Sequence, residues 1–460
     1  MFGSDSGKDT RIMLGDPKTA IYATVIPFII SSIIGQINML ADLAWCSGLG
    51  ASSVNAVQSV VPLYWVVFDV GLGVGLGSNV LISNYIGAGN YDRARKILAQ
   101  GTVLSVIIAV LIAPITFLLI DPMVTWMGAP ELIGAAESYL APILICNIFQ
   151  VLGPTLSGFL RGEGAAKKSN YCIIIGTLAN IVIDPIFIFG LDLGVAGAGA
   201  ATALSGAVSV ILMLYIYLSG KTTIKLSLKG YRFDRKESFA ILRLGIPKMA
   251  EMFLLDIADA FCRSFFIACG GVNAISLFSI PYRVVLLASL VPGAFGLALT
   301  PVSSANLGAG KPEKSLYAYN LCLKWTLGLT AILVLIYLTC TEYLLIPFTL
   351  SDSMTELSPE MVETLRVQSF IIPFLAISLV SNSMLQSLQK PMLSLSVTAF
   401  RTLLMVVLLA ALSTTTVPLM CWGLVLSLAF TACYSFMLAR HNIGKIIKTS
   451  GNPARSVIFK

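Results

Sequence analysis

The sequence is poor in charged residues and almost without histidine. Of its 460 residues only 12% are charged and 57% are hydrophobic, whereas soluble domains are about 25% charged. A chain this apolar cannot cover itself with polar side chains, which excludes an ordinary soluble domain. The single histidine, His441, lies in the C-terminal tail, which argues against histidine-based catalysis or metal binding. The nine cysteines form no metal motif and no disulfide framework, and no nucleophile–base set is visible. We therefore expect neither an enzyme nor a cofactor.

Long uncharged stretches are what the sequence has instead. Residues 19–41, 97–120, 138–160 and 367–389 contain no Asp, Glu, Lys or Arg. Each is long enough for a helix across about 30 Å of hydrocarbon. The hydropathy pattern predicts an all-α integral membrane protein with twelve spans, at roughly 19–45, 54–82, 95–120, 131–158, 168–189, 194–218, 239–268, 273–304, 316–340, 365–387, 391–412 and 419–439.

The charges between the spans alternate in sign from loop to loop. One set of loops is basic, with runs at 93–96 and 221–236, and the other is acidic, with Asp121, Glu131 and Asp192. The positive-inside rule places the basic loops and both termini in the cytoplasm. We expect a multi-pass protein of the plasma membrane. The net charge of +7 then reflects this rule and not a nucleic-acid partner.

The chain repeats itself weakly. Residues 86–90 recur as 307–311, and 23–27 at the first span match 244–247 at the seventh. Six spans is an even number, so both halves insert the same way up. We expect two six-helix bundles related by a pseudo-twofold axis along the membrane normal, an arrangement that typically carries a substrate path between its halves. The predicted domains are an N-lobe at 1–218, a cytoplasmic linker at 219–238, a C-lobe at 239–440 and a cytoplasmic tail at 441–460.

Two acids within the spans are the first candidates for function, because a carboxylate in hydrocarbon costs ~2.5–3.5 kcal/mol and marks a cavity or a proton route. Asp42 and Asp184 lie at similar depth near the outer ends of spans one and five. Asn180 projects from the same helix face as Asp184, Pro185 should bend the helix, and Thr202 can reach the same depth. These oxygens suit a hard cation such as Na⁺, and paired carboxylates can share a proton.

Three further acids are candidates for a second coupling group. Asp256 and Asp259 lie in span seven, where Arg263 follows Asp259 by four residues and can cancel its charge. Asp256 then remains as the second coupling acid. Asp69 lies in span two beside the glycines of 71–77, whose spacing predicts close helix packing and not nucleotide binding.

Three stretches carry a resemblance to a known family. They are residues 27–42 running on to 48–50, residues 82–90, and residues 180–190 running on to 197–202. With these the chain resembles the multidrug and toxic compound extrusion (MATE) transporters, most closely their DinF-like prokaryotic branch. The resemblance implies efflux of organic, often cationic, compounds in exchange for inward H⁺ or Na⁺.

The resemblance also implies a cation site at the positions of Asp42, Asn180, Asp184 and Thr202. The remaining acids, Asp69, Asp256 and Asp259, are not part of that branch's pattern, although another branch uses an acid in helix seven near the position of Asp256. A second coupling site therefore stays open.

The function that these observations favour is secondary active efflux by alternating access, from a monomer whose partners are small organic substrates and the bilayer. One alternative is a lipid-linked saccharide flippase, which would need a strongly cationic central cavity. Arg263, Arg283 and Arg401 favour it, and the acids of spans one, five and seven argue against it. The other alternative is a membrane receptor or channel without coupled transport.

Overall fold

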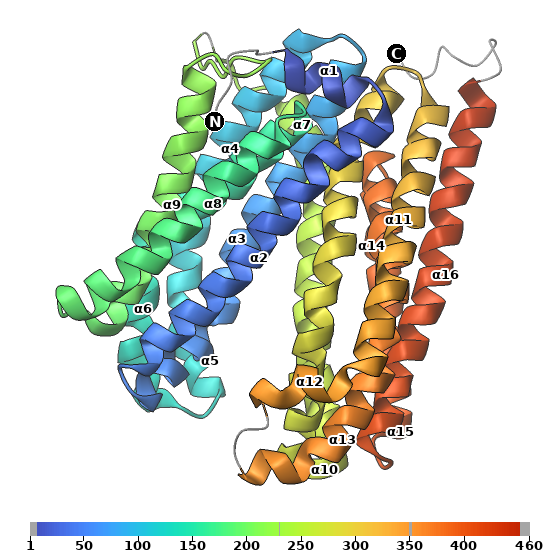
Figure 1. Ribbon diagram of the computed structural model, residues 1–460. Coiled ribbons are helices and arrows are strands. Elements are labelled where there is room, and N and C mark those ends of the chain that lie inside the picture. Colours follow the sequence, from blue (N-terminus) through green and yellow to red (C-terminus); the bar gives the residue numbers. More distant parts are fainter. Residues whose placement is uncertain (1–6, 230, 349–351, 451–460) are drawn as a thin grey trace. The chain divides into compact units, whose positions relative to one another are not determined.

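The regular structure of the chain is helical throughout the residues that the computed structural model describes, 7–229, 231–348 and 352–450 (Figure 1). The elements of the first half are α1 (Lys8–Leu14), α2 (Pro17–Ser47), α3 (Ala51–Gly87), α4 (Tyr91–Leu118), α5 (Ile120–Trp126), η1 (Pro130–Leu132), α6 (Ile133–Ile145), α7 (Asn147–Gly162), α8 (Ala166–Pro185), η2 (Ile186–Gly190) and α9 (Gly194–Leu218). Those of the second half are α10 (Arg235–Gly308), α11 (Pro312–Thr339), α12 (Thr341–Leu345), η3 (Ile346–Phe348), α13 (Asp352–Ser369), α14 (Ile371–Ser387), α15 (Pro391–Leu412) and α16 (Val417–Ser450).

The prediction of a twelve-helix membrane protein is confirmed. Ten helices of the described ranges are long and apolar enough to cross a bilayer, and the bent pair α6–α7 makes an eleventh. The twelfth is the first part of α10, which non-helical backbone at Gly270 and Gly271 separates from the second part. The predicted span within it, 239–268, is less apolar than the others because it carries six charged side chains, Arg243, Lys248, Glu251, Asp256, Asp259 and Arg263.

The chain folds as two compact units, Met1–Met249 and Ala250–Lys460. The start of α10 belongs to the first unit because it packs on α3 and α4. Ser238 donates a hydrogen bond to Gln100 (3.1 Å). A side chain at Gly245 would meet the backbone of Gly73 at 2.7 Å. The first unit thus extends beyond the basic linker into the seventh span.

Close packing of α3 on α7 forms the centre of the first unit. A Cβ atom on Gly158 would run into the carbonyl oxygen of Gly75, and one on Gly71 would lie 2.6 Å from that of Val151. Only glycine allows backbones to approach this closely. The glycines of 71–77 therefore act in helix packing, as their spacing predicts.

Two spans of the first unit are irregular. The predicted span 131–158 is broken into α6 and α7, which meet at an angle of 56°. The helix breaks at Cys146, where ψ is +16°, and the next side chain, Asn147, donates a hydrogen bond to the carbonyl of Ala109 on α4 (2.8 Å). The α8 helix ends at Pro185 and continues as the single π turn η2, in agreement with the helix disruption that proline predicts.

The second unit has its own core. The rings of Phe266 and Phe278 stack with their centroids 4.2 Å apart, on either side of the break in α10. The hydroxyl of Tyr337 on α11 donates to the carbonyl of Val284 (2.8 Å), and the Gln368 amide donates to that of Phe278 (3.1 Å). The last span continues as helix through residues 441–450, the first half of the predicted tail.

Candidate functional site

Four polar side chains of α2 and α8 form a connected group within the first unit. The Asn38 amide donates hydrogen bonds to Oδ2 of Asp42 (3.1 Å) and to Oδ1 of Asn180 (2.9 Å). The Asn180 amide donates in turn to Oδ1 of Asp184 (3.1 Å). The carboxyl groups of Asp42 and Asp184 lie within interaction range of each other, which closes the ring.

Local helix geometry explains how the ring is assembled. Asn38 and Asp42 are four residues apart on α2, as are Asn180 and Asp184 on α8, so each pair lies on one helix face. The α2 helix packs mainly against α8 within its unit, which brings the two faces together. The α8 pair is buried, with Asp184 only 2% exposed and Asn180 3%.

Two oxygens of the ring lack a hydrogen-bond partner. They are Oδ1 of Asn38 and Oδ1 of Asp42, both buried. A buried acceptor without a partner costs ~1–3 kcal/mol, so such groups call for a proton, a water or an ion. Carboxylate, amide and hydroxyl oxygens are the ligands of hard cations, and two adjacent carboxyl groups can also hold one proton between them. The ring fits either ion.

A cavity of about 170 Å³ opens beside the two acids. Its wall combines Asp42 and Asp184 with the aromatic rings of Tyr64, Trp65 and Tyr139. The Tyr64 and Trp65 rings pack edge to face with centroids 5.4 Å apart. An apolar wall with a few convergent polar groups is typical of small-molecule sites.

Thr202 lines this cavity but is not part of the ring. Its side chain lies beside the Tyr139 hydroxyl, and its carbonyl accepts a hydrogen bond from Gln150 (3.4 Å). The structure therefore brings Asp42, Asn180 and Asp184 into one connected group and places Thr202 on the wall beside them.

Asn38 and Tyr139 were missed by reasoning from the sequence. An asparagine inside an apolar run changes hydropathy little. The one available signal for Asn38 was its position four residues before Asp42, the same spacing that identified Asn180 beside Asp184. Tyr139 carries no such signal, because its approach to Thr202 depends on how α6 packs against α9.

The other three predicted acids lie elsewhere. Asp69 is half-buried on α3 and does not line the cavity. Asp256 and Asp259 are exposed residues of the second unit. Asp259 pairs with Arg263, whose Nε lies 2.7 Å from its Oδ2, with both side chains about half exposed at 47% and 49%. The predicted charge-cancelling pair is thus present.

Comparison with known proteins gives concordant matches. The MatE family profile matches residues 27–186 and 247–412. Over 331 residues the chain is 26% identical to the probable multidrug resistance protein YoeA of Bacillus subtilis, covering 68% of this chain and 70% of that protein. It is 25% identical to the multidrug export protein MepA of Staphylococcus saprophyticus over 62% of this chain and 64% of the relative.

The fold is also similar to solved structures. A crystal structure of MATE in the bent conformation superposes with a TM-score of 0.91 at 28% sequence identity. The superposition covers 97% of this chain and 100% of the other.

Proposed function

The chain belongs to the MatE family, and from this premise we propose that it is a multidrug efflux transporter that exchanges organic compounds for inward-moving H⁺ or Na⁺. The main support for coupling export to an ion is the connected group of Asn38, Asp42, Asn180 and Asp184. Burying two adjacent carboxyl groups costs several kcal/mol unless charge is compensated. A proton or Na⁺ supplies that compensation and reverses it on leaving.

The direct approach of the two carboxyl groups supports a proton as one coupling ion. Two ionised carboxylates in contact repel each other, so one proton held between Asp42 and Asp184 stabilises the arrangement. The unpartnered oxygens of Asn38 and Asp42 support Na⁺ as the other candidate. The same four residues, with Thr202 beside them, would hold either ion.

The cavity supports organic cations as cargo. Its aromatic rings offer faces for cation–π contact, and its two acids attract positive charge. Ion binding and cargo binding would then compete, because each neutralises the same carboxylates. Exchange requires this competition, because the cargo leaves to the outside when the ion arrives from the outside.

In the proposed cycle, ion entry from the outside releases the cargo outward, and the two halves then reorient so that the ion leaves inward. Each net charge that moves inward gains ~2.3 kcal/mol per 100 mV of membrane potential. Exchange of one ion for one monovalent organic cation moves no net charge, so the concentration gradient of the ion drives that export. We propose that the protein acts as a monomer in the plasma membrane, with the basic loops and both termini in the cytoplasm.

Vesicle transport tests this proposal. Purified protein is reconstituted, a pH gradient or a Na⁺ gradient is imposed separately, and accumulation of a fluorescent organic cation is followed. We expect accumulation with at least one gradient, and we expect Asp42→Asn and Asp184→Asn to abolish it while still inserting into the vesicles. Normal accumulation by both variants would refute the assignment of the ring.

The same assay addresses the alternatives. A receptor or channel gives no ion-driven accumulation in any vesicle. For a saccharide flippase, the cationic cavity would draw on Arg263, Arg283 and Arg401, yet the Arg263 charge is balanced by Asp259. No observation favours that function over efflux.

A further inference from the structure

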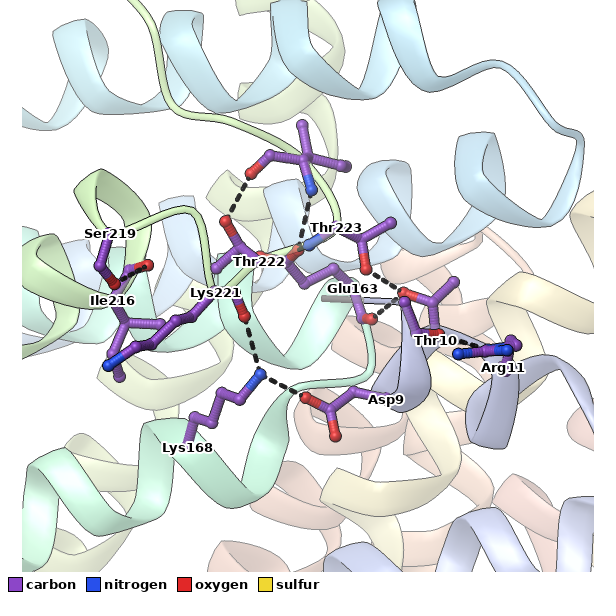
Figure 2. A network of polar contacts seen from close by, with 12 residues as sticks. Asp9, Thr10, Arg11, Glu163, Lys168, Ile216, Ser219, Lys221, Thr222 and Thr223 are labelled. Carbon is purple, nitrogen blue, oxygen red and sulfur yellow. Dashed lines mark hydrogen bonds and ion pairs between the residues drawn. The ribbon is translucent and has the colours of Figure 1, made fainter. Parts of the chain in front are cut away.

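Three segments meet at the basic end of the first unit, by which we mean the end formed by α1, the turn between α7 and α8, and the segment 219–224 after α9 (Figure 2). Lys168 on α8 joins them. Its Nζ lies 2.7 Å from Oδ2 of Asp9 on α1 and 2.8 Å from the carbonyl oxygen of Lys221. Lys168 thereby holds Lys221 over the first turn of α8.

Two lysines at this end each lie over a tyrosine ring. Nζ of Lys167 is 5.9 Å from the ring centroid of Tyr171 on α8, and Nζ of Lys221 is 5.0 Å from that of Tyr215 on α9. The α8 and α9 helices pack side by side, and Lys168, next to Lys167, is bonded to the carbonyl of Lys221, so both lysine–tyrosine pairs lie at the same end of the first unit. Amphipathic pairs of this kind are typical of the membrane–water interface, where the ring lies in the headgroup layer.

Two acidic residues of this end, Asp9 and Glu163, already have partners other than Lys167 and Lys221. Asp9 is bound to Lys168. Glu163 is 1% exposed, and its Oε2 accepts hydrogen bonds from the backbone nitrogens of Thr223 (2.9 Å) and Ile224 (3.2 Å). The accessible surface is therefore positive, and the dipole of α8 adds positive potential at its first turn. An anion complements this charge.

An apolar strip continues from the lysines along α9. Ile211, Tyr215 and Leu218 follow at helical spacing and are all exposed, Leu218 at 78%. On a membrane-spanning helix such a face lies against hydrocarbon. The complementary ligand is therefore one that joins an anionic group to acyl chains, and a free phosphate would leave the strip uncovered.

We propose that Lys167 with Tyr171 and Lys221 with Tyr215 form a binding site for the phosphate headgroup of an anionic phospholipid, whose acyl chains lie along the exposed face of α9. The site lies outside the cavity of the coupling ring, and it requires only that the chain spans a bilayer. It does not depend on which ion is exchanged or on the cargo.

Native mass spectrometry of the purified full-length protein tests the proposal. The protein is titrated in detergent with phosphatidylglycerol or phosphatidylcholine of matched chains, and bound lipid is counted. A lysine beside an anionic headgroup contributes roughly a fivefold gain in affinity. We expect the wild type to bind phosphatidylglycerol more tightly than phosphatidylcholine. In Lys167→Gln/Lys221→Gln the affinity for phosphatidylglycerol should fall by roughly 20-fold, and the affinity for phosphatidylcholine should not change.

A matched control separates the site from general surface charge. Lys225→Gln/Lys229→Gln removes two exposed lysines of the following segment and should leave the preference intact. Lys167→Arg/Lys221→Arg should retain it, because arginine keeps the charge and the contact with the ring. Gel filtration and thermal melting establish that each variant is folded. Undiminished phosphatidylglycerol binding by the double glutamine variant, or an equal loss in the control, would overturn the proposal.

Discussion

The side-chain amide of Asn38 lies 2.9 Å from the amide oxygen of Asn180, and this contact links the acid of α2 to the acid of α8. The same Asn38 nitrogen also donates to Asp42. Asn38→Leu would leave Oδ1 of Asn180 and Oδ2 of Asp42 without this donor, at a cost of ~1–3 kcal/mol for each buried acceptor. Because a proton on Asp42 relieves this cost, we expect proton-driven cargo uptake in vesicles to reach half its maximum at roughly tenfold lower proton concentration.

The neighbouring Ile37 provides the control for Asn38. It is 53% exposed, so Ile37→Leu keeps volume and polarity on the same helix turn and should transport as the wild type does. Asn38→Ser, which keeps a short donor, should fall between the two. Unchanged ion dependence in Asn38→Leu would show that Asp42 and Asp184 do not need this amide.

Thr202 distinguishes the two candidate ions. Its hydroxyl lines the cavity and contacts Tyr139, not the carboxyl pair. We propose that bound Na⁺ draws the Thr202 hydroxyl from Tyr139 as an additional oxygen ligand. Its loss would weaken Na⁺ binding by about tenfold, whereas a proton held by Asp42 and Asp184 needs no such ligand. In vesicles, Thr202→Val should keep proton-driven uptake within about twofold and require roughly tenfold more Na⁺ for Na⁺-driven uptake. Ser205→Ala, one turn further along α9, is the control. Equal loss under both gradients would contradict this division.

The sequence predicted those parts of the site that local geometry determines. Asn180 and Asp184 share a helix face because of their spacing, and Pro185 ends α8 because it lacks a backbone donor. The twelve spans follow from hydropathy and from the alternation of loop charge. The seventh span, the least apolar of them, is one of the twelve on which the alternation of loop charge depends.

The remaining features depend on contacts between distant residues. Asn38 and Asn180 are 142 positions apart, and nothing in either helix alone indicates that their amides meet. Beside the break at Cys146, Asn147 likewise bonds to Ala109 on α4, 38 positions away. Thr202 lines the same cavity as Asp42 and Asp184, but its side chain approaches Tyr139 because α6 packs against α9.

The approach of Gly158 to Gly75 makes a further prediction, on stability. A methyl group at residue 158 would run into the carbonyl oxygen of Gly75, so Gly158→Ala must push α7 away from α3. Overpacking of this kind costs ~1–3 kcal/mol, and we expect a lower melting temperature in detergent. At Gly134 on α6 a Cβ meets nothing within 4 Å, so Gly134→Ala should melt at or slightly above the wild-type temperature. Equal melting of the two variants would argue against a tight α3–α7 contact.

Glu163 makes the stability depend on pH. Burial raises the pKa of this carboxyl from 4.5 to about 7, although hydrogen bonds from the backbone of Thr223 and Ile224 oppose the rise. The folded protein therefore holds the proton more tightly than the unfolded chain. This stabilisation is complete below pH 4.5 and is lost as the pH rises through about 7. A pKa shift of this size corresponds to a contribution of roughly 3 kcal/mol to the free energy of unfolding.

A neutral side chain at residue 163 should remove that dependence. Glu163→Gln cannot ionise, so its melting temperature should fall less than that of the wild type between pH 5 and pH 8, and its advantage should grow with pH. Glu131→Gln, which removes an exposed acid, should follow the wild-type curve. Melting of purified protein in detergent at closely spaced pH values measures the difference. If the curves of Glu163→Gln and the wild type run parallel, the buried carboxyl does not take up a proton in this range, and the pH dependence arises elsewhere in the fold.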